Sequence, residues 1–186
     1  MMPHYFLAIP VPEEVKKHLS ERASIMKKRL TYGYWTDRAD YHITLFFIGE
    51  ASSEQIDQLN TELWKIAVKQ PAMEIRLNGF GTFGKKDEPR VVWMGVQYDS
   101  YLPALSQAVQ ECAVKVGFQE EKRPYRPHIT IAKKWRGRPV TNEEWQASLP
   151  EFEPLGWRAV EFALYRVEPA QTPRYVMVER FPLQER

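Results

Sequence analysis

The chain alternates between segments with strand-like and helix-like hydrophobic patterns. Seven short segments are rich in apolar, aromatic and β-branched residues, and one of them, residues 72–80, places an apolar residue at nearly every second position. These patterns predict strands over residues 4–9, 41–49, 72–80, 90–98, 128–134, 158–168 and 174–181. Between them lie segments with the wider spacing typical of amphipathic helices.

Two of the predicted helices are recognised by their hydrophobic positions and ends. The first covers residues 13–30 and places Val15, Leu19 and Met26 near one face. A later helix over residues 102–117 finishes at a glycine, the residue that most readily adopts the left-handed conformation beyond a helix end. Both are expected to pack one face against a sheet.

Two further helices are predicted from their capping signals. Ser52 with Gln55, and Thr141 with Glu144, have the spacing of a capping box, in which two side chains satisfy backbone groups at a helix start. The first box precedes a helix that ends just before Pro71, and the second precedes a short helix.

The order of elements repeats with a displacement of about 86 residues. A β-α-β-α-β plan occurs in each half of the chain. This predicts one domain over residues 1–186 made of two similar lobes related by a pseudo-two-fold axis, lobe one over about residues 4–86 and lobe two over about residues 88–186.

The two halves share a short His-Ile-Thr-aliphatic motif. It reads "HITL" at residues 42–45 and "HITI" at residues 128–131, although the chain has only four histidines and eight threonines. Two chance His-x-Thr matches among four histidines would have a probability of about 1%. A pair of core histidines bonded to neighbouring hydroxyls is the alternative interpretation. Two motifs at equivalent places favour a shared site.

Strand geometry gives each motif a direction. Residues i and i+2 share a face, so His42, Thr44 and Phe46 are expected to point one way and Ile43, Leu45 and Phe47 into a helix-covered core. In the second lobe, His128 and Thr130 share a face in the same way. A two-fold axis would bring both faces to one groove.

Two imidazoles beside two hydroxyls suit phosphoryl transfer. Imidazole titrates near pH 6.5, so one ring can act as a base while the other acts as an acid. The hydroxyls of Thr44 and Thr130 can hydrogen-bond non-bridging phosphate oxygens. The sequence alone fits either histidine in either role.

Charge distribution indicates an anionic substrate better than the net charge of +2 does. Residues 122–138 carry seven basic residues and no acidic one. Arg126, two residues before His128, is predicted to counter phosphate charge. Tyr125 and Trp135 are candidates for stacking on a base, with structural packing as the alternative.

Several other signals are weighed and set aside. "GFGTFG" at residues 79–84 spells a dinucleotide-binding fingerprint, but a charged turn and a strand follow it instead of a helix, so a hairpin connection is predicted. Cys112 is the only cysteine and is expected to be a buried helix residue. His18 is expected at a helix surface or boundary, and no metal-ligand spacing is present. No apolar run is long enough to span a membrane, which predicts a cytoplasmic protein without a membrane partner.

The chain resembles the RNA 2′,3′-cyclic phosphodiesterase family, also called 2′-5′ RNA ligase-like proteins, of the two-histidine phosphoesterase superfamily. The resemblance rests on the paired H-x-[ST]-x motifs and on flanking segments in the expected order: "FLAIPVPEEV", "HITLFFIGE", "PRVVWMGV", "RPHITIAK" and "RYVMVERFPL". It implies an α+β fold of two pseudo-symmetric lobes, each an antiparallel-rich sheet with helices outside, around a central cleft.

The resemblance also implies an activity. The expected reaction is hydrolysis of an RNA-terminal 2′,3′-cyclic phosphate to a 2′-phosphate without metal or cofactor, with ligation as its reversal. His42 would be the proton donor and His128 the proton acceptor, while Thr44 and Thr130 would hold the phosphate. The alternatives are a phosphodiesterase acting on 2′-5′ oligonucleotides or a small cyclic nucleotide, and a non-catalytic RNA-end-binding protein. A monomer is expected because two lobes already complete the site.

Overall fold

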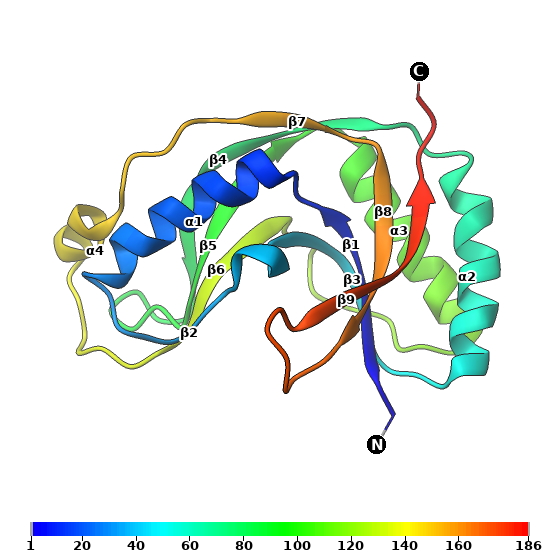
Figure 1. Cartoon of the computed structure of the whole chain (residues 1–186), viewed down its shortest axis with the longest axis horizontal. Coiled ribbons are helices and arrows are strands. Elements are labelled where there is room, and N and C mark those ends of the chain that lie inside the picture. The colour runs from blue at the N-terminus through cyan, green and yellow to red at the C-terminus, as the bar shows by residue number, and fades with distance from the viewer. Residues whose placement is uncertain (1, 186) are drawn as a thin grey trace.

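The computed structural model describes residues 2–185 as two antiparallel sheets with helices on their outer sides (Figure 1). The first sheet has the order β3-β1-β8-β9 and the second has the order β2-β6-β5-β4-β7. The strands are β1 (His4–Pro10), β2 (Tyr32–Trp35), β3 (His42–Glu50), β4 (Met73–Phe83), β5 (Val91–Tyr98), β6 (His128–Trp135), β7 (Gly156–Ala159), β8 (Glu161–Val167) and β9 (Tyr175–Pro182). The α+β class predicted from the sequence is confirmed.

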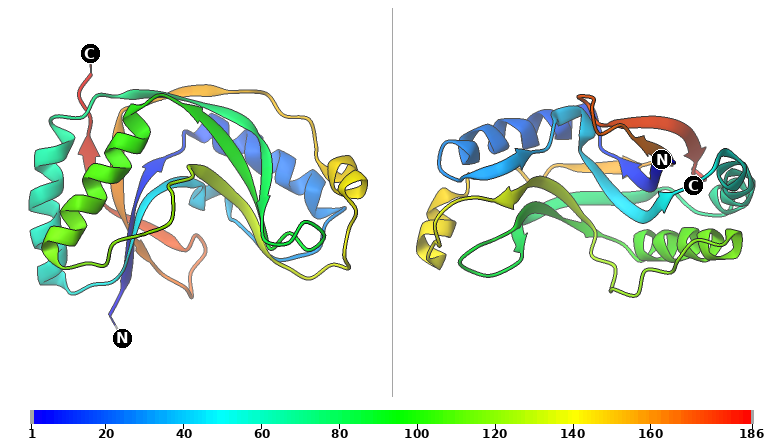
Figure 2. Two further views of the ribbon diagram at one scale, coloured as in Figure 1. Left: turned by 180° about the vertical axis from the view of Figure 1, so that it is seen from behind. Right: turned by 90° about the horizontal axis from the view of Figure 1, so that it is seen from below.

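Helices cover the ends of the molecule. They are α1 (Glu13–Lys27), α2 (Ser53–Ala67), α3 (Tyr101–Val116) and α4 (Asn142–Ser148), with a short 3₁₀ helix, η1 (Arg38–Asp40). In the opposite views of Figure 1 and of the left panel of Figure 2, α2 and α3 lie beside the first sheet, and α1 and α4 lie at the second. No helix within residues 2–185 is long and apolar enough to cross a membrane.

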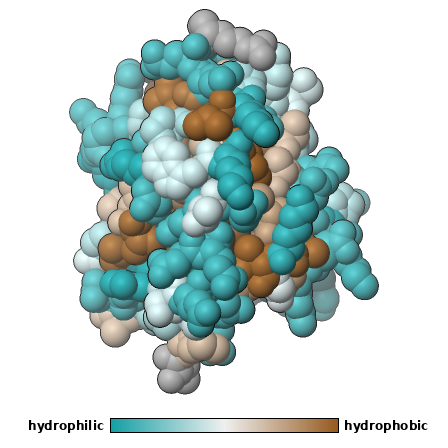
Figure 3. Space-filling model, turned by 90° about the vertical axis from the view of Figure 1, so that its right-hand side faces the viewer, coloured by the Kyte–Doolittle hydropathy of each residue, from teal (hydrophilic) through white to brown (hydrophobic). Residues whose placement is uncertain are grey.

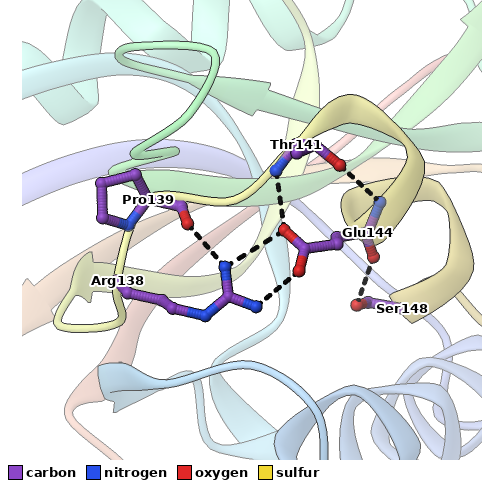
Figure 4. A network of polar contacts seen from close by, with 5 residues as sticks. All are labelled: Arg138, Pro139, Thr141, Glu144 and Ser148. Atoms are coloured by element: carbon purple, nitrogen blue, oxygen red, sulfur yellow. Dashed lines mark hydrogen bonds and ion pairs between the residues drawn. The ribbon is translucent and has the colours of Figure 1, made fainter.

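The predicted helix signals are present as hydrogen bonds. The Ser52 hydroxyl accepts from the Gln55 amide and the Gln55 side chain accepts from the Ser52 amide, and Thr141 with Glu144 does the same at α4. Each box is typically worth about 1 kcal/mol. At α4, the Arg138 guanidinium also donates hydrogen bonds to the Glu144 carboxylate (Figure 4).

The buried faces of the helices follow the predicted pattern. Val15, Leu19 and Met26 of α1 are buried, and so is Cys112 of α3. The side of the molecule that carries α2 is mostly hydrophilic, with small separate hydrophobic patches (Figure 3). Buried side chains from both sheets form one continuous hydrophobic core.

The two sheets exchange strands between the halves of the chain. The strand β8 of the second half pairs with β1 in the first sheet, and β4 of the first half pairs with β5 in the second sheet. In sheet order, β3-β1-β8-β9 corresponds to β6-β5-β4-β7, so the repeated unit is present with its third strand exchanged. The sheets therefore do not follow the predicted division into residues 4–86 and 88–186.

The strands of the structure differ from the prediction in three places. The strand expected over residues 158–168 is broken at Val160, because β7 joins the second sheet and β8 joins the first. The four-residue strand β2 was not predicted. In β3, the partner strand pairs with Phe46 and then with Thr44, so Leu45 is an extra residue that reverses the side-chain alternation.

That bulge decides which phenylalanine is buried. Phe46 is 3% exposed and Phe47 is 59% exposed, the reverse of the regular alternation expected from the sequence. The expectation for His42, Thr44 and Ile43, which precede the bulge, is unaffected because alternation is regular there.

Candidate active site

His42 stands at the first position of β3, directly after η1 and Tyr41. Its Nδ1 lies 2.7 Å from the Asp40 carbonyl oxygen. A carbonyl oxygen only accepts hydrogen bonds, so Nδ1 carries a hydrogen and Nε2 is the nitrogen left for chemistry. Nε2 lies 3.0 Å from the Thr44 hydroxyl, as expected for side chains two residues apart on one face of a strand.

His128 is held in the same way in the second sheet. It is the first residue of β6, and its Nδ1 lies 2.6 Å from the Arg126 carbonyl oxygen, again two residues earlier. The cross-strand neighbours correspond as well, because His42 pairs with Pro10 of β1 and His128 with Gly95 of β5. The fold therefore builds one local arrangement twice and presents two Nε2 atoms.

Aromatic side chains surround both imidazoles. Around His42, ring centroids lie 4.7 Å away for Phe6, 5.2 Å for Tyr175 and 6.2 Å for Tyr165. The tyrosine at 165 belongs to the exchanged strand β8. These rings remove water from one side of the imidazole and leave it half-buried.

Phe83 and Trp93 cover one side of the His128 imidazole in the same way. Their ring centroids lie 5.0 and 6.0 Å from the imidazole, and Phe83 belongs to the exchanged strand β4. The indole of Trp93 lies over Gly81, where a Cβ would come within 2.1 Å of the ring. Each histidine is thus walled partly by the strand that comes from the other half of the chain.

Burial lowers the pKa of both histidines. The pKa of His42 falls to about 4, chiefly through loss of hydration, against the opposing effect of the Asp40 carbonyl. The charge of His128 lowers the His42 pKa further, which places His42 within the field of a protonated His128. The pKa of His128 is also lowered by burial, with the Arg126 carbonyl opposing. At neutral pH, both rings are therefore neutral in the free protein.

Comparisons with known proteins agree with this arrangement. The family model described as the 2′-5′ RNA ligase superfamily matches residues 11–170. The chain belongs to this superfamily. The family predicted from the paired motifs is confirmed.

Relatives of known description in the superfamily match nearly the whole chain. A protein named RNA 2′,3′-cyclic phosphodiesterase from Geobacillus stearothermophilus is 35% identical over 97% of this chain. The matched region covers 57% of that relative's length. A protein of the same name from Bacillus subtilis is 33% identical over 97% of both chains. The crystal structure of E. coli LigT complexed with 3′-AMP has a TM-score of 0.80 and 26% identity, covering 98% of this chain and 99% of that one.

In this superfamily member, Asp40 connects His42 to the first sheet's edge, a role that the sequence did not indicate. Its carboxylate is 2% exposed and accepts hydrogen bonds from the amides of Arg174 and Tyr175, at 2.8 and 3.1 Å. Burial raises its pKa, and the two amides oppose that change. Asp40 therefore ties the start of β9 to the carbonyl that orients His42.

A pair of cations lies beside the same region. The Arg174 guanidinium lies 4.3 Å from the centre of the Tyr34 ring, and the Lys133 ammonium lies 5.0 Å from it. Burial and the neighbouring Arg174 charge lower the pKa of Lys133. Lys133 belongs to the basic run seen in the sequence. Arg174 begins the predicted strand over residues 174–181 and Tyr34 lies outside the predicted elements, and no role in the site was predicted for either residue.

The three predicted substrate-binding residues have different surroundings. Arg126 is exposed, and since β6 begins only at residue 128, strand alternation does not orient its side chain. The Tyr125 hydroxyl donates to the Thr44 carbonyl oxygen at 3.1 Å, which ties the segment before β6 to β3. Trp135 packs edge-to-face on Tyr32 at 5.1 Å, seven residues along the strand from His128. Packing thus accounts for the positions of both aromatic residues.

The structure also tests the predictions for His18 and for the "GFGTFG" segment. His18 was expected near the surface, but it is 7% exposed and its Nε2 accepts a hydrogen bond from the Glu153 amide at 3.1 Å. The "GFGTFG" glycines lie at the end of β4 and in the turn to β5, which confirms a hairpin connection. Within residues 2–185, no group of three or more His, Cys, Asp or Glu side chains is placed to hold a metal ion.

Proposed function

We propose that this protein hydrolyses the 2′,3′-cyclic phosphate at the 3′ end of RNA to a 2′-phosphate. Two curated relatives that each match 97% of this chain carry the name of this activity. The observation that carries the proposal is the duplicated histidine arrangement, in which each Nδ1 is bound to the carbonyl two residues earlier. Two imidazoles fixed in this way supply the acid and the base of an in-line displacement.

The proposed step needs only two proton transfers. Water attacks phosphorus and gives a proton to Nε2 of His128 as the new P–O bond forms. The bond from phosphorus to the 3′-oxygen breaks, and that oxygen takes the proton from Nε2 of His42. The phosphate remains on the 2′-oxygen. Afterwards His128 holds the extra proton and His42 is neutral, so exchange with solvent resets the pair.

Because the pKa of His42 is low in the free protein, the charge of the substrate must raise it before His42 can act as an acid. An acid with a pKa of about 4 would be almost fully deprotonated at pH 7. A phosphate anion about 4 Å away contributes about 4 kcal/mol at an effective dielectric constant near 20, which corresponds to about 3 pKa units. Binding of the substrate therefore brings His42 to a pKa near neutrality, where an imidazole is an efficient general acid.

Thr44 and Thr130 hold the phosphate in this proposal. The Thr44 hydroxyl lies against Nε2 of His42 in the free protein, so it must turn towards a phosphate oxygen when the imidazole donates its proton. Thr130 shares the face of His128 on β6, two residues along. A hydroxyl on each side neutralises no charge but orients the non-bridging oxygens.

The same groups can catalyse ligation. If the 5′-hydroxyl of a second RNA takes the place of water, the identical proton transfers yield a 2′-5′ phosphodiester. Both histidines come from one chain, so we propose that a monomer suffices for either direction. Measurement of turnover across the elution profile of a size-exclusion column tests this point.

Phosphorus NMR on a short RNA ending in a 2′,3′-cyclic phosphate tests the proposed function. With excess EDTA, the wild type should produce a 2′-phosphate, and His42→Ala and His128→Ala should each lower the rate by about 10²-fold or more. His4→Ala, which changes a histidine outside the motifs, is the control. A 3′-phosphate product would reverse the leaving oxygen, and dependence on metal would contradict the two-histidine mechanism.

A substrate panel separates the remaining alternatives. No conversion of the cyclic end, together with cleavage of 2′-5′ oligonucleotides or of a small cyclic nucleotide, would change the substrate and keep the chemistry. Binding of the RNA end without turnover of any ester would instead identify a binding protein.

A further inference from the structure

A hollow of about 460 Å³ lies beside β2, at the outer edge of the second sheet. Residue 27 and residues 30–35 line it, so its wall is the end of α1, the following turn and all of β2. Its volume is in the range of sites that hold small ligands or parts of larger ones. The mechanism proposed above assigns nothing to this hollow.

The hollow has one basic lining residue and a second basic side chain beside it. Lys27 lines it, and the Arg136 side chain lies across Gly33, with Nε 2.7 Å from the point where a Cβ would stand. None of the lining residues is acidic. Within residues 2–185, the Arg136 guanidinium forms no ion pair with a carboxylate, so its charge faces the solvent in this part of the molecule.

The hollow also presents aromatic rings. Tyr34 and Trp35 line it and are both half-buried, so part of each side chain remains accessible. A positive groove with aromatic rings is the usual combination in proteins that bind single-stranded nucleic acid, because phosphates contact the cations and bases stack on the rings.

Tyr34 links the hollow to the histidines. Its ring contacts the Arg174 guanidinium, the Arg174 amide binds the Asp40 carboxylate, and the Asp40 carbonyl holds His42. On the other side, Lys133 contacts the same ring and its charge reaches His42. Along β6, the five steps from His128 to Lys133 span about 16 Å, more than a single nucleotide bound at the histidines would cover.

We propose that the hollow along β2 binds the RNA strand on the 5′ side of the cyclic phosphate. In this arrangement, Arg136 contacts a backbone phosphate and Tyr34 or Trp35 stacks on a base. The inference rests on the proposed function and deepens it, because it identifies the substrate as a single-stranded oligoribonucleotide in preference to a mononucleotide.

Turnover of two substrates of different length tests the inference. The substrates are adenosine 2′,3′-cyclic phosphate and a trinucleotide that ends in the same group. The wild type should have a kcat/KM at least tenfold higher for the trinucleotide. Arg136→Ala should remove most of that advantage, with less than a twofold change for the mononucleotide, which reaches only the histidines.

Two further variants separate binding in the hollow along β2 from a general effect of lost positive charge. Gly33→Ala keeps every charge but displaces the Arg136 side chain, so it should lower the trinucleotide advantage by about threefold. Arg138→Ala removes a charge only two residues away, but that guanidinium is bound to Glu144 (Figure 4). It should leave the length preference unchanged.

Binding of a fluorescent trinucleotide with a 3′-phosphate provides a readout that does not need turnover. Arg136→Ala should raise Kd about tenfold and lower the slope of log Kd against log salt by about 0.7, the value for one single-strand phosphate contact. Equal kcat/KM for both lengths, or an Arg136→Ala effect that is the same for both, would overturn the inference and leave the proposed function standing. Turnover of neither substrate would contradict the proposed function. If Arg136→Ala then also left the Kd and the salt slope unchanged, the inference about the hollow would be overturned as well.

Discussion

At the scale of single residues, the site is built from one local device used twice. A histidine at the start of a strand donates Nδ1–H to the carbonyl two residues earlier, so that only Nε2 faces the reaction. The two copies differ in what precedes them. Asp40 is buried and bound to two amides, whereas Arg126 is exposed. His42 itself loses hydration on burial, which lowers its pKa to about 4 against the opposing effect of the Asp40 carbonyl.

The pH dependence of turnover should reveal the effect of the substrate on His42. In the free protein both histidine pKa values are lowered, so the alkaline limb of kcat/KM, where the rate falls as the pH rises, should lie below pH 6.5. In the complex, the phosphate raises the His42 pKa, so the alkaline limb of kcat should lie near pH 7. Steady-state rates between pH 4 and pH 9 check this. Coincident alkaline limbs would show that the substrate does not charge His42.

Asp40 should act as a positioning residue. Asp40→Ala leaves two part-buried amides without acceptors, which should cost about 2–3 kcal/mol in the free energy of unfolding, and it should lower kcat about tenfold with little change in KM. Asp40→Asn keeps one acceptor and should restore part of both.

Urea unfolding and steady-state kinetics measure these effects, with Asp57→Asn on the exposed face of α2 as the control. A loss of stability at unchanged kcat would limit Asp40 to a structural role.

The sequence predicted the reacting residues but not their supports. His42, Thr44, His128 and Thr130 form a pattern that is readable in the chain because each pair is local and the two pairs match. Asp40 and Arg174 meet only through tertiary contact across 134 residues, so neither had a signal. Arg126 was noted for its charge, yet its carbonyl oxygen is the group that contacts His128.

At the scale of elements, capping and periodicity predicted the helices well because those signals are local. Strand assignments failed where the sheet decides. Residues 158–168 have the pattern of one continuous strand, but the chain passes from one sheet to the other at Val160. The strand β2 contains only four residues, one of them a glycine, and its pairing with β6 has no local signal.

The glycine-rich end of β4 shapes the wall beside His128. Gly81→Ala would drive a methyl group into the Trp93 indole, where the nearest ring atom lies 2.1 Å from the Cβ position. We expect a loss of about 1–3 kcal/mol in the free energy of unfolding and a lower kcat. Gly156→Ala in β7 is the matched control, because its Cβ would meet nothing closer than 3.5 Å. Equal effects of the two variants on kcat would argue against this role for the indole.

At the scale of the whole molecule, buried histidines make stability depend on pH. The pKa values of His42, His128 and His18 are all lowered by burial, so between pH 6.5 and about 4 the unfolded chain binds more protons than the folded one. Their contribution is fully present above about pH 6.5 and is lost as the pH falls. The 2.5-unit difference for His42 sets an upper limit of about 3 kcal/mol.

The share of His42 can be isolated. His42→Asn should flatten the dependence of the free energy of unfolding on pH between 6.5 and 4, relative to the wild type. Urea titrations at half-unit pH steps provide the measurement. An unchanged slope in His42→Asn would mean that the ring is protonated as readily in the folded state as in the unfolded one.

The exchange of β4 and β8 makes the two halves of the chain interdependent. Cut in the exposed turn after β4, fragments 1–87 and 88–186 would each lack a strand that completes a sheet, and each would leave one imidazole without part of its aromatic wall. Neither fragment alone should show a cooperative unfolding transition, whereas mixing them should restore both the transition and turnover. The duplicated protein would then behave as an obligate heterodimer whose subunits happen to be joined by a peptide link, and the mutual placement of the histidines is what that interlocking protects.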